Sequence, residues 1–217
     1  AGVGKTASVK ALITMLEDEG FTYTLLAPTG IAAKRLREST GREASTIHMA
    51  LATNEPIGQF LILDEVGMIS VSLLAKLLEH INADTKIIFI ADPSQLASIS
   101  CGNVVRDLLD SGVMPVANLT KVFRYNSSGI ITLSTDVRNG RNEHLTDTYT
   151  DYKFVEISSQ AIKQIGQEYA ALVSGNYNPA DVLILSPFNK GPVGSMAINA
   201  AIQAKFNPNP MSGITYK

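Results

Sequence analysis

The chain opens with the six residues AGVGKT at positions 1–6, and a second informative stretch, LILDE, stands at positions 61–65. The first stretch matches the last three positions of the phosphate-binding pattern G-x-x-x-x-G-K-[ST], whose first glycine would fall two places before Ala1. Glycines let backbone N–H groups wrap around phosphate oxygens, and the N-terminus of the following helix favours negative charge. The structural alternative is a glycine turn that merely caps a helix.

Each of these residues has an expected task. Lys5 would reach the β- and γ-phosphates of ATP, and the Thr6 hydroxyl would ligate Mg²⁺. The second stretch is an apolar strand that ends in two acids, so Asp64 would hold Mg²⁺ and Glu65 would polarise the attacking water. Two solvated acids at a strand end remain the alternative. The expected nucleotide contacts are Gly2, Val3, Gly4, Lys5, Thr6 and Ala7.

Apolar runs and helical periodicity alternate along the chain. The runs at 23–27, 60–63, 87–90 and 182–185 predict buried parallel strands. Apolar residues at helical spacing predict helices around 9–16, 73–78 and 104–109, with Gly20 and Gly112 as stops. Strands that alternate with helices indicate an α/β fold with a mostly parallel sheet.

A polar cluster follows each predicted strand, at residues 28–30, 64–65, 91–95 and 186–187. Open α/β sheets bind ligands at the carboxyl ends of their strands, so these clusters should gather at one edge. A boundary near 115–130 should separate two domains, assigned as 1–120 and 121–217. The second should hold helices near 130–138 and 159–173 and strands near 152–157 and 182–185.

Two further residues are candidates for the hydrolysis step. Gln95 follows the third strand, where an uncharged amide can sense the γ-phosphate and the attacking water. Arg124, in the stretch VFRY at 122–125, is the candidate arginine finger, a group that stabilises charge in the transition state. The alternatives are an ordinary turn for Gln95 and a surface arginine for Arg124.

Composition sets limits on the class of protein. The 217 residues are 45% hydrophobic and 18% charged, as in ordinary globular α/β proteins. No apolar run approaches the ~18 residues of a membrane span, and no secretory signal is expected. One cysteine, Cys101, excludes an internal disulfide and fits a reducing cytoplasm. With a net charge of −2, nucleic-acid binding would need local contacts.

The order of these elements resembles superfamily 1 helicases, specifically the RecD-like group that includes the exonuclease V alpha subunit. The resemblance is carried by residues 27–36, 45–48, 63–68, 91–96, 102–108, 119–124 and 185–192. It implies a P-loop NTPase with a RecA-like parallel sheet, covered by helices on both faces, followed by an incomplete second RecA-like lobe. ATP would bind between the lobes, and single-stranded DNA would lie across both.

The resemblance also assigns DNA contacts. Motif Ia of the family corresponds to Pro28, Thr29 and Gly30, and motif Ib corresponds to Thr46 and His48. A further candidate is Lys190, which follows the predicted strand of the second lobe. Thr29 could instead cap the helix that begins at Gly30, and a lone histidine is usually structural. Lys190 is equally consistent with a DNA contact and with an ordinary surface lysine.

Three departures from the family pattern matter. Tyr125 follows Arg124 where the family has glutamine, which puts one contact in doubt. The short interval between His48 and Phe60 leaves the strand-separating β-hairpin of the family unaccounted for. The chain stops at Lys217, before the late motifs, so we expect a fragment cut at both ends.

The expected function is that of an ATP-dependent DNA helicase or translocase motor with 5′-to-3′ polarity, in recombination and repair. Its partners would be single-stranded DNA, or duplex with a 5′ overhang, and possible subunits of a recombination nuclease. One alternative is an ATP-binding subunit of a recombination or mobilisation complex that does not itself unwind. Another is a P-loop enzyme with a substrate other than nucleic acid. RNA in place of DNA stays open.

Overall fold

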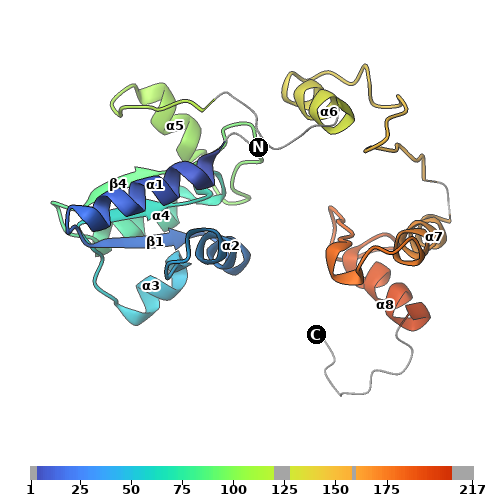
Figure 1. Cartoon of the computed structure of the whole chain (residues 1–217), viewed down its shortest axis with the longest axis horizontal. Coiled ribbons are helices and arrows are strands. Elements are labelled where there is room, and N and C mark those ends of the chain that lie inside the picture. Colours follow the sequence, from blue (N-terminus) through green and yellow to red (C-terminus); the bar gives the residue numbers. More distant parts are fainter. Residues whose placement is uncertain (1–3, 120–127, 158–159, 207–217) are drawn as a thin grey trace. The chain divides into compact units, whose positions relative to one another are not determined.

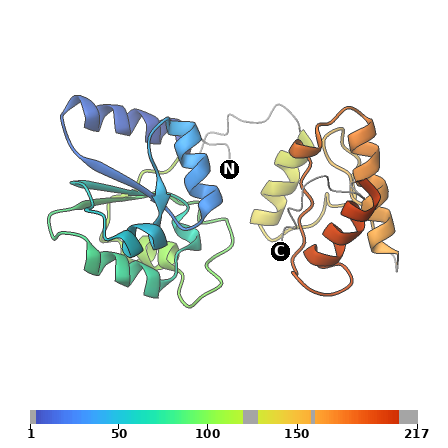
Figure 2. The same cartoon turned by 90° about the horizontal axis from the view of Figure 1, so that it is seen from below.

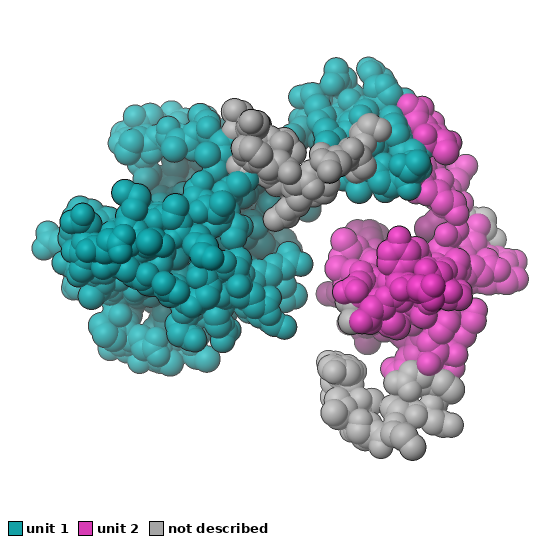
Figure 3. Space-filling model, viewed as in Figure 1, with its two compact units in different colours: residues 1–145, 149–151 teal, residues 146–148, 152–217 magenta. Residues whose placement is uncertain are grey.

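The computed structural model describes residues 4–119, 128–157 and 160–206. The chain forms two compact units, shown in different colours in Figure 3. The first comprises residues 1–145 and 149–151, and the second comprises residues 146–148 and 152–217. Each unit is considered by itself below.

The first unit is built on a parallel sheet of four strands. These are β1 (Tyr23–Ala27), β2 (Ser45–Thr46), β3 (Phe60–Leu63) and β4 (Lys86–Phe89), in the order β2-β1-β3-β4. Leu26 pairs with Leu63, and Ile62 pairs with Ile88. The predicted strands at 23–27 and 60–63 are confirmed, and the third lies one residue earlier than predicted.

Helices cover both faces of this sheet (Figure 1 and Figure 2). One face, through Leu25 and Ile62, packs on α1 (Lys5–Asp18) and α2 (Gly30–Thr40). The other, through Leu26 and Leu63, packs on three helices: α3 (Ile47–Thr53), α4 (Val71–His80) and α5 (Val104–Ser111). Successive strand residues point to opposite faces, so a strand buried on both faces is apolar at every position.

The helix boundaries follow from local chemistry. Val9, Ile13 and Leu16 form the buried stripe of α1. Gly20 and Gly112, at φ 73° and 64°, adopt the left-handed conformation that stops α1 and α5 as predicted. The first unit also has a short 3₁₀ turn, η1 (Val66–Met68), directly after the acidic pair.

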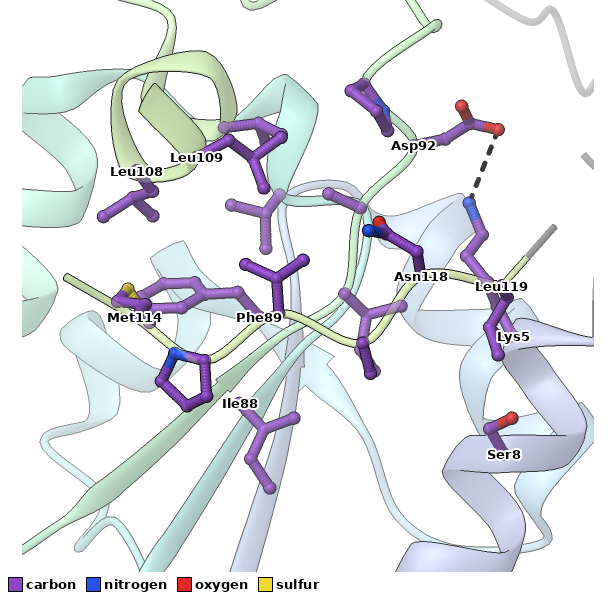
Figure 4. A pocket seen from close by; sticks show the side chains of 18 of the residues that line it. Lys5, Ser8, Ile88, Phe89, Asp92, Leu108, Leu109, Met114, Asn118 and Leu119 are labelled. Carbon is purple, nitrogen blue, oxygen red and sulfur yellow. Dashed lines mark ion pairs between the residues drawn. The ribbon is translucent and has the colours of Figure 1, made fainter. Parts of the chain in front are cut away.

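β4 lies at one edge of the sheet. The N–H groups of Lys86 and Ile90 donate to the carbonyls of Gln59 and Leu63, on the β3 side. No strand among the described residues pairs with the other side of β4. A cavity of about 860 Å³ runs along this free edge, between Val9 and Leu12 of α1, Leu108 of α5 and the segment 114–119 (Figure 4).

The remaining helices are α6 (Ser128–Arg138), α7 (Ala161–Ser174) and α8 (Ser195–Phe206), with a 3₁₀ turn, η2 (Pro179–Asp181), before the last. The predicted helices near 130–138 and 159–173 are confirmed. In the second unit α7 packs on α8, and the rings of Tyr169 and Phe206 meet edge to face at 5.1 Å. The sequence patterns did not single out α8.

The strands predicted near 152–157 and at 182–185 are wrong, because no strand forms in either described segment. Val182 and Ile184 are partly buried, whereas Leu183 and Leu185 are 77% and 82% exposed, so burial alternates as it would along a strand. A strand is completed by hydrogen bonds to a neighbour. No described segment supplies that neighbour here.

Candidate nucleotide-binding site

The strand order arranges the predicted site residues along one edge of the sheet. Because all four strands are parallel, their carboxyl ends meet at the same edge. The β3–β4 half of this edge carries Asp64, Glu65 and Asp92. The β2–β1 half carries the candidate DNA contacts at residues 28–30 and 46–48. The edge thus has one half that carries the candidate nucleotide-binding residues, called the nucleotide half below, and one half that carries the candidate DNA contacts.

Lys5 is the first residue of α1 and points toward the end of β4. Gly4 precedes it in the left-handed conformation, at φ 88°, and within residues 4–119 no side chain caps the helix. The N–H groups of the first turn are therefore available to an anion. The Lys5 Nζ lies 3.7 Å from the Asp92 carboxylate (Figure 4). Gly2 and Val3 lie outside the described residues; Thr6 and Ala7 are exposed in the first turn of α1.

Asp64 follows β3 directly and is held by its backbone, since its N–H donates to the Leu26 carbonyl at 2.9 Å. Its carboxylate accepts the Glu65 N–H at 2.9 Å. Burial raises the pKa of Asp64, while that hydrogen bond and the charge of Lys5 act in the opposite direction. Burial disfavours the charged form of a carboxylate, and a nearby cation favours it. The Asp64 side chain is therefore suited to bind a magnesium ion. Among the described residues no group of three or more typical ligand side chains forms a metal cluster.

Glu65 has an unusual backbone. Its φ of 51° is in the left-handed region, which costs a non-glycine residue roughly 1–3 kcal/mol. Two hydrogen bonds fix the turn: the Val66 N–H donates to the Ile90 carbonyl, and the Met68 N–H donates to the Glu65 carbonyl, both at 3.1 Å. Strain of this kind gathers at functional sites, because surrounding contacts must maintain it.

Gln95 lies in an exposed turn closed by its own N–H, which donates to the Asp92 carbonyl at 3.1 Å. Within the described part of the chain its side chain makes no hydrogen bond. The turn thus holds the backbone of Gln95 against that of Asp92, and the Gln95 side chain forms no hydrogen bond with Lys5 or Glu65. Arg124, the predicted arginine finger, lies outside the described residues.

Asp92 is the site residue that sequence reasoning missed. Its side chain is only 12% exposed, and it lies near both Lys5 and Arg138. The relevant signal was its position after the third predicted strand, beside Gln95. Strand order, which brings the end of β4 next to the start of α1, cannot be read from the apolar runs themselves.

The candidate DNA residues have clear local roles. The Thr29 hydroxyl accepts the Ala32 N–H at 3.2 Å and caps α2, as the alternative anticipated. The Thr46 hydroxyl caps α3 in the same way, through Met49. His48 is exposed on the first turn of α3, Pro28 is partly buried, and Gly30 is exposed. Each cap uses one acceptor lone pair of the hydroxyl, which can still donate its proton to a ligand, and the exposed His48 is open to a ligand as well.

Two other expectations concern loops. Lys190, in the second unit, is exposed in the bend just before the turn that the Gly194 N–H closes on the Gly191 carbonyl. The interval between His48 and Phe60 contains the rest of α3, a left-handed Asn54 and a short connection to β3. No hairpin is present in that interval. Among the described residues no helix has both the length and the apolarity to cross a membrane.

A helix that starts at a Gly-Lys-Thr turn, an acidic pair at the end of a buried strand and a parallel sheet covered on both faces define a P-loop protein with a RecA-like sheet. The family described as AAA domain matches residues 1–160. The chain therefore belongs to that family, as a RecD-like member of helicase superfamily 1.

Several relatives support this assignment. The chain is 31% identical over 218 residues to the ATP-dependent RecD2 DNA helicase of Deinococcus radiodurans, covering 95% of this chain and 30% of the relative. It is 34% identical over 163 residues to the ATP-dependent DNA helicase dda of Enterobacteria phage T4, covering 65% and 37%. It is 30% identical over 176 residues to the RecBCD enzyme subunit RecD of Mycolicibacterium smegmatis, covering 64% and 32%.

The chain thus spans about a third of the length of these curated relatives. Among solved structures, a Bacteroides Pif1 helicase in complex with ADP-AlF3 and single-stranded DNA matches 82% of this chain and 52% of its own, at 19% identity and a TM-score of 0.48. The family assignment rests on the sequence matches.

Proposed function

We propose that this chain is the motor portion of an ATP-dependent DNA helicase that couples ATP hydrolysis to 5′-to-3′ movement on single-stranded DNA. The observation that carries the proposal is the gathering of Lys5, Asp64, Glu65 and Asp92 at one sheet edge, next to a helix N-terminus that no described side chain caps. The activity is proposed for the whole protein.

In this proposal the first lobe, residues 1–120, binds ATP with Mg²⁺. Backbone N–H groups of residues 2–7 surround the phosphates, and Lys5 contacts the β- and γ-phosphates. Thr6 and Asp64 are the proposed magnesium ligands, and Mg²⁺ would neutralise charge that develops on the phosphate oxygens. Glu65 orients and polarises the attacking water, and Gln95 senses the γ-phosphate.

The second lobe would begin near residue 121 and supply Arg124 as the arginine finger. ATP would close the two lobes on each other, and hydrolysis followed by reopening would advance the protein along one strand. The hydrogen bonds that join the ends of β1, β3 and β4 support this coupling. They connect Asp64 to Leu26 and Val66 to Ile90, so the nucleotide half of the edge is fastened to the other half.

The proposed DNA contacts are Pro28, Thr29, Gly30, Thr46, His48 and Lys190. The relatives named as DNA helicases support DNA as the substrate, and the relative named as a RecBCD subunit supports association with a recombination nuclease. Contacts by hydroxyl, imidazole and ammonium groups suit phosphate and base edges of a single strand. A cytoplasmic location is part of the same proposal.

The first experiment measures ATP hydrolysis by the full-length protein with and without a single-stranded oligonucleotide, at low and moderate salt. Strong stimulation that weakens as salt rises is expected, because phosphate contacts release counterions. Lys5→Ala should abolish hydrolysis, and His48→Ala should weaken DNA stimulation more than basal turnover. Hydrolysis indifferent to the oligonucleotide would instead favour an enzyme with a small substrate, and full turnover in Lys5→Ala would refute the site.

A further inference from the structure

One carboxylate oxygen in the nucleotide half of the edge lies between two cationic side chains. Oδ2 of Asp92 is 3.7 Å from Lys5 Nζ and 3.9 Å from an Nη atom of Arg138. All three belong to the first unit, and Arg138 is the last residue of α6. The Asp92 side chain is 12% exposed, that of Lys5 is 22% exposed and that of Arg138 is 40% exposed. Asp92 is the most shielded of the three, so its interactions with nearby cations are screened less than those of a fully exposed pair.

The carboxylate is also fixed in direction. Its other oxygen, Oδ1, accepts the Ser94 N–H at 3.1 Å, within the turn that follows β4. Asp92 therefore cannot turn away freely from the phosphate side of the edge. Arg138 also borders the cavity beside β4, which brings its guanidinium to the same end of the sheet as Lys5.

Binding of ATP changes the charge balance around Asp92. Lys5 must direct its ammonium group to the β- and γ-phosphates, so its contact with Asp92 is weakened. A fixed carboxylate would then face an incoming polyanion with less compensation than before. Like charges at short range in a partly buried site oppose binding. A second cation beside Asp92 removes that opposition.

We propose that Arg138 is a positioning residue of the nucleotide site, which neutralises Asp92 when Lys5 turns from Asp92 to the phosphates. The proposal rests on the proposed function, because it assigns a task to Arg138 within the same ATP site. Arg138 acts through Asp92 and touches no phosphate. ATP binding thereby shifts Asp92 from a pair with Lys5 to a pair with Arg138, which fastens α6 to the end of β4.

The test is a double-mutant cycle on ATP affinity in the full-length protein, measured by isothermal titration calorimetry with ATP and Mg²⁺. Arg138→Ala should weaken ATP binding by about 3- to 10-fold, the usual range for loss of a partly shielded charge partner. Asp92→Asn keeps the acceptor for Ser94 and removes the charge, so it should bind ATP at least as tightly as the wild type. The double variant should recover wild-type affinity to within about 2-fold.

The rescue distinguishes this role from two others. If Arg138 bound phosphate directly, or only stabilised α6, Asp92→Asn would not restore ATP binding to the Arg138→Ala protein, and the proposal would be overturned. Unchanged affinity in Arg138→Ala would also overturn it. Arg106→Ala is the matched control, since Arg106 is 73% exposed and pairs only with Asp110 among the described residues. Failure of the wild type to bind ATP, or equal binding by Lys5→Ala, would refute the proposed function instead.

Discussion

Lys5 and Asp64 both carry charge in partly buried positions, and each needs a compensating group. In the structure Lys5 has Asp92 at 3.7 Å, while burial leaves Asp64 with a raised pKa despite the positive charge of Lys5. A nucleotide with Mg²⁺ would supply an opposite charge to each residue, because its phosphates attract Lys5 and its metal attracts Asp64. At the scale of single residues, Asp64 therefore lies where a bound cation would favour the charged form of its carboxylate.

Glu65 leads to a separable prediction. Glu65→Gln should leave ATP binding within about 2-fold of the wild type, because glutamine is isosteric and the turn is held by backbone hydrogen bonds. Hydrolysis should fall by at least about 100-fold, since a neutral amide cannot polarise water as a general base. Calorimetry and steady-state ATPase assays on the same preparation measure the two quantities. Equal loss of binding and turnover would make Glu65 a structural residue.

At the scale of elements, three hydrogen bonds fasten the strand ends together. Asp64 N–H donates to Leu26, Ile90 N–H donates to Leu63, and Val66 N–H donates to Ile90, at 2.8–3.1 Å. Consequently the turns that follow β1, β3 and β4 cannot shift independently. We therefore expect a displacement at the acidic pair to reach the turn at residues 28–30 and the start of α2.

Substitution of Thr29 tests whether the start of α2 contributes to DNA stimulation as well as to stability. Thr29→Ala removes the cap of α2 and should lower the free energy of unfolding by about 1 kcal/mol, while DNA stimulation of the ATPase also weakens. Thr29→Ser keeps a hydroxyl at this position, so it should retain both the stability and the DNA stimulation of the wild type. Urea unfolding and ATPase assays give the two readouts.

Ser70→Ala is the matched control for Thr29, because Ser70 caps α4 through the Leu73 N–H and is not a candidate DNA contact. It should lower stability by a similar amount and leave DNA stimulation unchanged. If Thr29→Ala behaves like Ser70→Ala, the Thr29 hydroxyl is a cap alone.

A second element-scale prediction concerns the contact between α1 and the loop after α2. Arg42 donates two hydrogen bonds to the Glu17 carboxylate, at 2.7 and 2.8 Å, and Tyr23 donates a third at 2.6 Å. The hydrogen bonds from Arg42 and then Tyr23 lower the pKa of Glu17 from 4.5 to about 2. Since the folded pKa is depressed, the stabilisation is present above pH 4.5 and is lost as the pH falls toward 2.

Glu17→Gln should therefore lower the urea midpoint slightly at pH 7, and its difference from the wild type should shrink between pH 4.5 and 2. The effect is small because both side chains are substantially exposed to solvent. Arg106→Ala, which breaks an exposed pair within one helix, provides the comparison. A difference that persists unchanged at pH 2 would show that the carboxylate charge is not the cause.

At the scale of the molecule, the sequence predicted the first unit well and the second poorly. The strands at 23–27 and 60–63 were recognisable because strands buried on both faces are apolar throughout. The apolar run at 182–185 has the same composition but no described neighbour to pair with, and composition alone cannot supply one. The role of Asp92 could not be predicted for a similar reason. Its position beside Lys5 depends on the order of the strands in the sheet, which no single segment of sequence encodes.

Among the described strands, the free edge of β4 is one place where a further strand could be added to the sheet. The amides of Ile87 and Phe89 alternate with those bound to β3 and so point away from it, toward the cavity of about 860 Å³. Such an edge can pair with one further strand, either from the rest of the same protein or from another molecule, and among the β4 residues the exposed charge of Lys86 at its start disfavours pairing. A strand that pairs there would extend the sheet and cover the side chains that line the cavity.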